Sequence, residues 1–203
     1  MTHESDSLNA MLGILSAFER GLFPRGFIHG LPLESHPYSL GWMHVHSVKP
    51  KRRQDFPSWS WAGWEGTVRF PQRLLLEQPG EPCPRSDLEP EVLAHEGPSL
   101  TLNAWLVDLE IVTDPFSEVR VPNGTETTGF VTERNSPHPN TLPSGPYSCL
   151  VAQRVRYAGG RQVVVMVVLD WDGDAATRRT LITLDVRMNL LAFGAERRVV
   201  TLV

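Results

Sequence analysis

The segment 56–64 constrains this chain most, because it reads Phe-Pro-Ser-Trp-Ser-Trp-Ala-Gly-Trp and so brings three tryptophans together. In an extended strand Trp59 and Trp61 would point to one face, and the small pair before Trp64 would let the backbone bend. Each such ring can bury roughly 150–250 Å², so we expect the three to dominate the packing of a core. The alternative is an aromatic ligand platform made of the same three rings. A stacked nucleic acid would also need a cationic groove, which the neighbouring sequence lacks, so we favour the core.

Composition bounds the class of protein. The chain has 203 residues, 41% hydrophobic and 21% charged, and a formal net charge of −4, which is ordinary for a globular domain. It has no long basic stripe, so neither nucleic acid nor an anionic membrane surface is expected as a partner. The basic cluster 49–53 is short and predicts a solvated turn.

Other features predict a cytoplasmic protein. The N-terminus is polar and has no hydrophobic signal core. The longest apolar run, 163–169, is far shorter than the ~20 residues that span a bilayer. Cys83 and Cys149 cannot form a disulfide framework or a zinc site, and we expect both to be free thiols in a reducing compartment.

The segment 6–20 predicts an amphipathic helix. Asp6 is placed to cap its start, while Gly21 and Pro24 mark its end. Its apolar stripe consists of Leu8, Met11, Leu12, Leu15 and Phe18. We divide the chain into this helical unit, 1–22, and a β-rich domain, 23–203.

Alternating or continuous apolar runs separated by turn residues predict a mainly β, α+β fold, an antiparallel sandwich or open barrel with an N-terminal helix. Segments 147–155 and 162–171 should form a hairpin closed at 158–160. Long proline-rich loops are expected at 71–98 and 135–146. The other expected strands are 40–48, 56–70, 99–111, 128–132, 180–184 and 197–203, and 185–192 is an expected short helix.

Few residues of this sequence suggest metal binding or catalysis. His44 and His46 would share one face of a strand, which is a metal half-site without a nearby third ligand, so we favour a structural role over a metal-dependent enzyme. The acidic run 170–174 resembles the start of a calcium loop, but the twelfth position is Leu181 and not glutamate. We interpret this run as an acidic turn whose carboxylates pair with arginines 178 and 179 at the surface. No motif places a nucleophile beside a base, so we predict no catalytic residue and no cofactor.

Three groups of segments, taken together, resemble the C-terminal region of fungal heterokaryon-incompatibility (HET domain) proteins. In that family a Gly-Leu-Pro turn, a strand bearing tryptophan and a Pro-Ser-Trp-Ser-Trp-Ala-Gly-Trp block follow one another in this order. The matching pieces are 6–10 with 13–15, then 26–32, 40–42, 52–53 and 56–64, then 165–168, Trp171, Ala175, Arg178 and 198–202.

The resemblance implies a role but no active site. The HET domain of these proteins, which resembles the TIR fold and drives cell death by attack on NAD, would precede the helix at 6–20. That domain is missing here, so no catalytic residue is carried over. The resemblance therefore implies a non-enzymatic accessory region with a scaffold or protein-interaction role in self/non-self recognition. Its partner would be another protein or the upstream HET domain, which would dock on the apolar stripe of the helix. The two alternatives from other classes are the stand-alone tryptophan platform and the metal-dependent enzyme.

Overall fold

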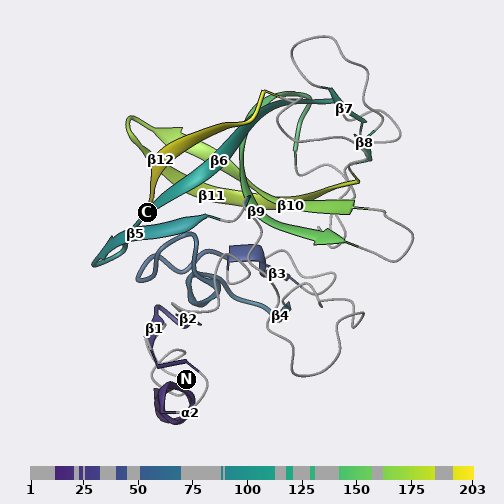
Figure 1. The fold of residues 1–203 in the computed structure, drawn as a ribbon. Coiled ribbons are helices and arrows are strands. Elements are labelled where there is room, and N and C mark those ends of the chain that lie inside the picture. The colour runs from purple at the N-terminus through teal and green to yellow at the C-terminus, as the bar shows by residue number, and fades with distance from the viewer. Residues whose placement is uncertain are drawn as a thin grey trace.

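The computed structural model describes residues 12–20, 23–24, 26–32, 40–44, 51–69, 88, 90–112, 118–120, 129–130, 142–156, 162–185 and 194–203. Strands dominate these residues, and α2 is the α-helix among them (Figure 1). In chain order the elements are α2 (Leu12–Glu19), β1 (Phe27–Ile28), β2 (Leu31–Pro32), β3 (Met43–His44), the 3-10 helix η2 (Trp61–Gly63), β4 (Val68–Arg69), β5 (Glu91–Glu96), β6 (Ser99–Val112), β7 (Glu118–Arg120), β8 (Gly129–Phe130), β9 (Gly145–Arg156), β10 (Gln162–Asp172), β11 (Ala175–Asp185) and β12 (Glu196–Leu202).

Five strands pair in a ring that runs β6–β9–β10–β11–β12 and returns to β6 (Figure 1). Its pairings are antiparallel except for the short parallel contact of β11 with β12. Outside the ring, β5 and β7 pair with β6, and β8 pairs with β7. The prediction of a mainly β, α+β fold is therefore confirmed. The ring corresponds to the barrel alternative, in a closed rather than an open form.

Two cores lie on opposite faces of these strands. Along β10 the side chains alternate between them, which explains its unbroken apolar run. The face that carries the tryptophans, here called the tryptophan core, includes Trp42, Trp59, Leu100, Leu102, Leu106, Leu150, Val165, Val167, Leu169, Leu181, Val200 and Leu202. The second core includes Val107, Leu109, Ile111, Cys149, Val151, Val164, Met166, Val168, Ile182 and Leu184.

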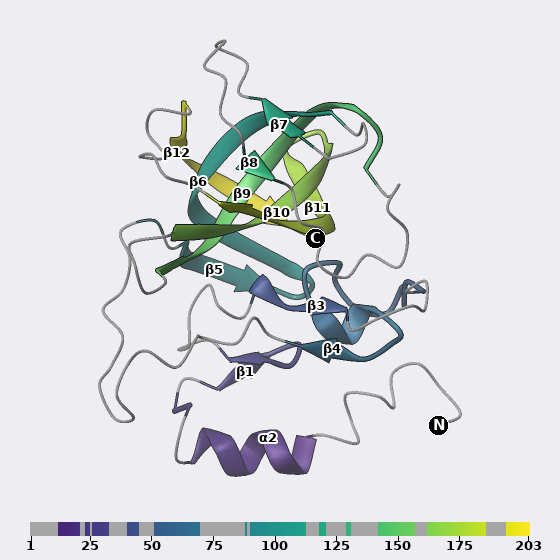
Figure 2. The same ribbon diagram turned by 90° about the vertical axis from the view of Figure 1, so that its right-hand side faces the viewer.

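The N-terminal elements lie on one side of the ring, and α2 is the element farthest from it (Figures 1 and 2). Strands β1 and β2 form a hairpin whose turn residues, His29 and Gly30, have φ values of 45° and 82°. A pair of positive φ angles is what a tight two-residue hairpin turn demands. Gly30 is also required by space, because a Cβ there would lie 2.6 Å from the Trp61 ring.

The predicted strand 56–70 is wrong over most of its length. Its centre is the 3-10 helix η2, and only Val68–Arg69 is a strand, paired with β3. The reason is local hydrogen bonding. The Ser60 side chain accepts the Ala62 N–H at 3.0 Å, and the Ser60 N–H donates to the Pro57 carbonyl at 3.2 Å. Serine side chains offer the backbone such an alternative to a strand ladder.

Several other boundaries differ from the expected ones. The predicted loop 71–98 contains β5, which turns at Gly97 (φ 53°) directly into β6. The predicted strand 180–184 begins earlier, at Ala175. The predicted strand at 40–48 is a strand only at Met43–His44 among the described residues. The β9–β10 hairpin is confirmed. Its turn, residues 135–141 of the predicted loop 135–146 and most of the helix predicted at 185–192 lie outside the described residues. The predicted loop is wrong at its end, because β9 already begins at Gly145.

Candidate functional site: the tryptophan segment and Arg178

The tryptophan segment folds as a joint between the N-terminal elements and the ring. Its indole N–H groups all donate to backbone carbonyls: Trp59 to Pro98 at 3.0 Å, Trp61 to Gly30 at 3.1 Å and Trp64 to Ser58 at 2.9 Å. A buried indole needs such an acceptor, and these acceptors come from three different parts of the chain. The rings therefore hold β1–β2 and the β5–β6 turn together.

A fourth tryptophan, Trp42, also bonds to the tryptophan segment. The Trp42 ring is 1% exposed, and its N–H donates to the Trp59 carbonyl at 2.9 Å. The Ser60 hydroxyl donates to the His29 carbonyl at 2.6 Å, which ties η2 to the β1–β2 turn. At Gly63 a Cβ would lie 2.5 Å from the Pro57 carbonyl oxygen, so no side chain fits there. Close packing thus requires glycine at position 63, and its neighbour Ala62 is fully buried.

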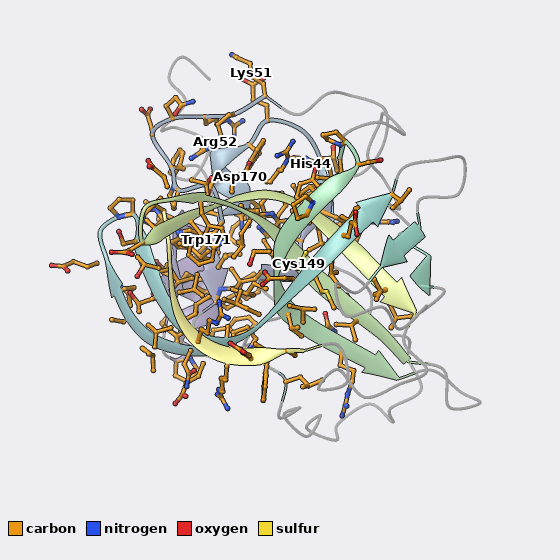
Figure 3. The ribbon with its side chains drawn as sticks, turned by 90° about the horizontal axis from the view of Figure 1, so that it is seen from above. His44, Lys51, Arg52, Cys149, Asp170 and Trp171 are labelled. Atoms are coloured by element: carbon orange, nitrogen blue, oxygen red, sulfur yellow. The ribbon has the colours of Figure 1, made fainter. Side chains whose placement is uncertain are left out.

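Among the described residues of the basic cluster, Lys51 lies at the surface, whereas Arg52 and Arg53 bond to backbone carbonyls; the Arg53 side chain donates to the Ala62 carbonyl at 3.2 Å. Lys51 is exposed, reaches outward in Figure 3 and pairs with Glu65 at 3.3 Å, a contact worth under about 1 kcal/mol. Arg52 instead donates to the Gly63 carbonyl at 2.8 Å and to the carbonyls of Arg53 and Phe56. The prediction of a solvated turn is therefore wrong for Arg52, whose five N–H donors suit a site rich in carbonyls.

Arg178 is the main correction to the sequence interpretation. We expected it at the surface, paired with the acidic turn, yet it is 5% exposed and donates to the carbonyls of Leu40, at 2.6 Å, and Trp42. Its guanidinium carbon lies 3.7 Å from the centre of the Trp42 ring. Burial lowers the pKa of Arg178 to about 9, so the side chain stays charged at neutral pH. Arg179 does make the expected surface pair, with Asp170 at 3.0 Å.

Ser58 joins Arg178 to the end of β12. Its hydroxyl accepts the backbone N–H of Arg178 at 2.9 Å and donates to the Val203 carbonyl. The backbone N–H of Ser58 donates to the same carbonyl at 3.2 Å, and the Val203 N–H donates to the Ala176 carbonyl at 3.0 Å. The parallel contact of β11 with β12 is therefore braced by the tryptophan segment.

His44 lies beside this buried cation. Its ring packs edge-on against Trp42, with centroids 5.3 Å apart, and against Trp64 at 6.0 Å. Among the described residues its Nε2 is buried without a hydrogen-bond partner. Desolvation, with a smaller contribution from the charge of Arg178, lowers the pKa of His44 to about 4, although a hydrogen bond to the Thr67 backbone acts in the opposite direction. The imidazole is therefore neutral at physiological pH.

Acidification is expected to destabilise the protein through His44. Between pH 6.5 and about 4 the unfolded chain holds a proton on this residue that the folded chain does not, so stability falls as the pH is lowered through this window. Allowing for the partial exposure of the ring, we expect a loss of about 2 kcal/mol. Urea unfolding at several pH values measures it. His44→Gln should flatten the pH dependence, whereas His95→Gln, at an exposed position in β5, should not; equal slopes for all three proteins would contradict this.

The predicted binding residues differ in exposure. Trp59 is fully buried, and Trp61 and Trp64 are partly buried against the tryptophan core. Of the three, Trp61 and Trp64 alone are partly exposed to solvent.

Of the predicted metal half-site, His44 is described and His46 is not, and no group of three potential ligands gathers among the described residues. Cys149 is a free thiol as predicted, is buried, and lies within the body of the sheet in Figure 3, while Cys83 lies outside the described residues.

The predicted interface residues lie on α2 or just before it. Leu12 and Phe18 are 48% and 43% exposed, while Leu15 is buried. Leu8 and Met11 lie outside the described residues. Phe18 also contacts Phe23 edge-on, with ring centroids 6.5 Å apart.

Sequence reasoning missed Arg178 and Arg52 as structural residues. Arg178 shares a strand face with the buried Ala176, but the strand there was not predicted from the sequence, so this spacing became evident only in the structure. For Arg52 no sequence signal exists, because its acceptors lie on a turn that becomes evident only in the folded chain.

Fold and site together define a mainly β protein whose strand ring is joined to its N-terminal elements by a tryptophan–arginine cluster. Comparison with protein-family models, with curated proteins and with solved structures found no match. No helix among the described residues has the length and apolar character needed to cross a membrane. The resemblance to HET-domain proteins stays a prediction carried by its sequence motifs.

Proposed function

We propose that this chain is a non-enzymatic, cytoplasmic accessory region of a fungal heterokaryon-incompatibility protein. It serves as a scaffold in self/non-self recognition, and the HET domain docks on its helix α2. The proposal rests on the resemblance of the tryptophan block and its flanking segments. The observation that supports it in the folded chain is the exposed apolar surface of α2.

That surface is unusual for a short helix. Leu12, Ile14 and Phe18 are 48%, 53% and 43% exposed, whereas Leu15 alone is buried. An amphipathic helix normally turns its apolar residues toward a core, and clustered exposed apolar side chains mark interaction sites. The helix also lies at the end of the molecule away from the ring (Figure 2).

The two alternatives have weaker support. A tryptophan platform would have to work without the Trp59 ring, which is fully buried, and with the indole N–H groups of Trp61 and Trp64 already bonded to backbone carbonyls. A metal-dependent enzyme would use the Nε2 of His44, which has no hydrogen-bond partner among the described residues, together with His46. Metal analysis of the purified protein and an assay for NAD cleavage test that alternative directly.

The docking proposal predicts that a separately produced HET domain binds this chain through α2. Titration calorimetry should give a measurable dissociation constant for the unmodified chain. The double variant Leu12→Ser with Phe18→Ser should weaken binding at least about tenfold, because two large apolar side chains would no longer be buried on docking.

A matched control is Val199→Ser, which removes an apolar side chain that is 64% exposed on β12. It should leave the affinity unchanged. The absence of binding by the unmodified chain, or an equal loss in the control, would show that α2 does not dock a HET domain.

A further inference from the structure

Strand β5 is exposed along its whole length, which is unusual for a strand hydrogen-bonded to the main sheet. All six of its residues are exposed, and the apolar side chains of Val92 and Leu93 are 43% and 50% exposed. Its partner β6 instead alternates partly buried and buried side chains over Ser99–Leu106. Burial of its own apolar side chains therefore contributes little to holding β5 in place.

The outer edge of β5 offers backbone groups to a further strand. Among the described strands β5 pairs with β6 alone, so the N–H and C=O groups on its other edge have no strand partner there. The pairing register shifts between Val92 and Ala94, and such a bulge re-aims the side chain of the extra residue, Leu93.

The strand is held in position at its C-terminal end. The Gly97 carbonyl accepts a hydrogen bond from His29 Nε2 at 3.0 Å, and the Pro98 carbonyl accepts one from the buried Trp59 at 3.0 Å. The tryptophan joint therefore presents β5 as a preformed edge. A preformed edge lowers the entropic cost of adding a strand.

The charges of β5 determine which kind of strand can pair with its outer edge. Glu91 and Glu96 flank the apolar pair, and among the described residues the contacts of the Glu91 carboxylate are long, 3.6 Å to Arg197 and 3.5 Å to Asn103. A second copy of β5 paired antiparallel about its centre would place Glu91 opposite Glu96, and like charges directly opposite are destabilising. An extended segment with a cation at each end would instead match both glutamates.

We propose that β5 binds an extended basic peptide by strand addition. The peptide class is about six residues long, with lysine or arginine at both ends and β-branched apolar residues between them. The main chain of the peptide pairs with the outer edge of β5, its central side chains contact Val92 and Leu93, and its cations face Glu91 and Glu96. This site is distinct from the surface of α2 and does not depend on the role proposed above.

The probe is a capped six-residue peptide with lysine at each end and alternating valine and threonine between. Titration into the isotope-labelled full chain, followed by amide NMR, should shift the β5 amide signals and slow hydrogen exchange at its outer edge. The same peptide with alternate backbone nitrogens methylated, or with glutamate in place of lysine, should not bind.

Variants of β5 test separately its two glutamates and its apolar side chains. Glu91→Gln with Glu96→Gln should weaken binding about fivefold and reduce its salt dependence, since two exposed ion pairs are lost. The matched control, Glu65→Gln with Glu196→Gln, removes two exposed glutamates outside β5 and should have no effect. Val92→Thr should weaken binding while keeping the β-branched shape, whereas Val199→Thr should not.

Three results would overturn the proposal. The first is binding that survives methylation of the peptide backbone. The second is slow exchange of the outer β5 amides before any peptide is added, which would mean that another part of this chain already covers the edge. The third is concentration-dependent dimerisation that shifts the β5 signals without peptide, which would assign the edge to a second copy.

Discussion

Trp59→Ala is expected to lower the free energy of unfolding by about 4 kcal/mol, the largest single effect that we predict. The Trp59 ring is fully buried, lies edge-on to His29 with centroids 5.6 Å apart, and donates to the Pro98 carbonyl. Removing the ring leaves a large cavity in the tryptophan core and an unsatisfied carbonyl at the β5–β6 turn. Urea unfolding followed by circular dichroism measures the loss.

Trp171→Ala is the matched control, because Trp171 lies at the end of β10 and is 44% exposed. We expect a change of about 1 kcal/mol or less. Were Trp59 part of a ligand platform and not of the core, its replacement would leave stability near that of the control. That outcome would reverse the structural assignment of the tryptophan segment.

Arg178→Met should destabilise the protein by about 3 kcal/mol. The substitution leaves the carbonyls of Leu40 and Trp42 without their donor and removes the cation from the face of the Trp42 ring. It also relieves the cost of burying a charge, which acts in the opposite direction. We expect the lost hydrogen bonds to dominate, because methionine fills the volume but offers no donor.

The neighbouring arginine provides the control. Arg179→Met removes an exposed pair with Asp170 and should change the free energy of unfolding by less than about 1 kcal/mol. Arg178→Lys keeps the charge but cannot reach two carbonyls with a planar fork, so we expect it to restore only part of the stability. An Arg178→Met protein as stable as the wild type would mean that the desolvation cost outweighs the hydrogen bonds.

Elements with strong local periodicity were predictable. The alternation of leucines in β6 and the hairpin of β9 with β10 follow from side-chain spacing and turn residues within short windows. The unbroken apolar run of β10 agrees with the burial of both of its faces in the structure. Pattern reasoning failed at β5, because a strand with all its side chains exposed shows no alternation between buried and exposed positions.

Within the tryptophan segment, too, one feature could be predicted from the sequence and another could not. Its composition already indicated core packing, since three such rings in nine residues have too much apolar surface to leave in water. Its backbone path was not predictable. An extended strand and a 3-10 turn expose different backbone groups, and the choice depended on distant acceptors at Gly30, Pro98 and Val203.

The sequence by itself determined that this protein is mainly β, that tryptophans pack its core and that an amphipathic helix precedes the strands. These properties depend on the period and size of neighbouring side chains, which act over a few residues. Only the tertiary structure decided the closure of the ring through β6 and β12, the burial of Arg178 and the place of β5 beside β6, where it has no second partner among the described strands. The first two depend on contacts between segments far apart in the chain, and the third on which described strands pair with β5, and no local pattern encodes such pairings.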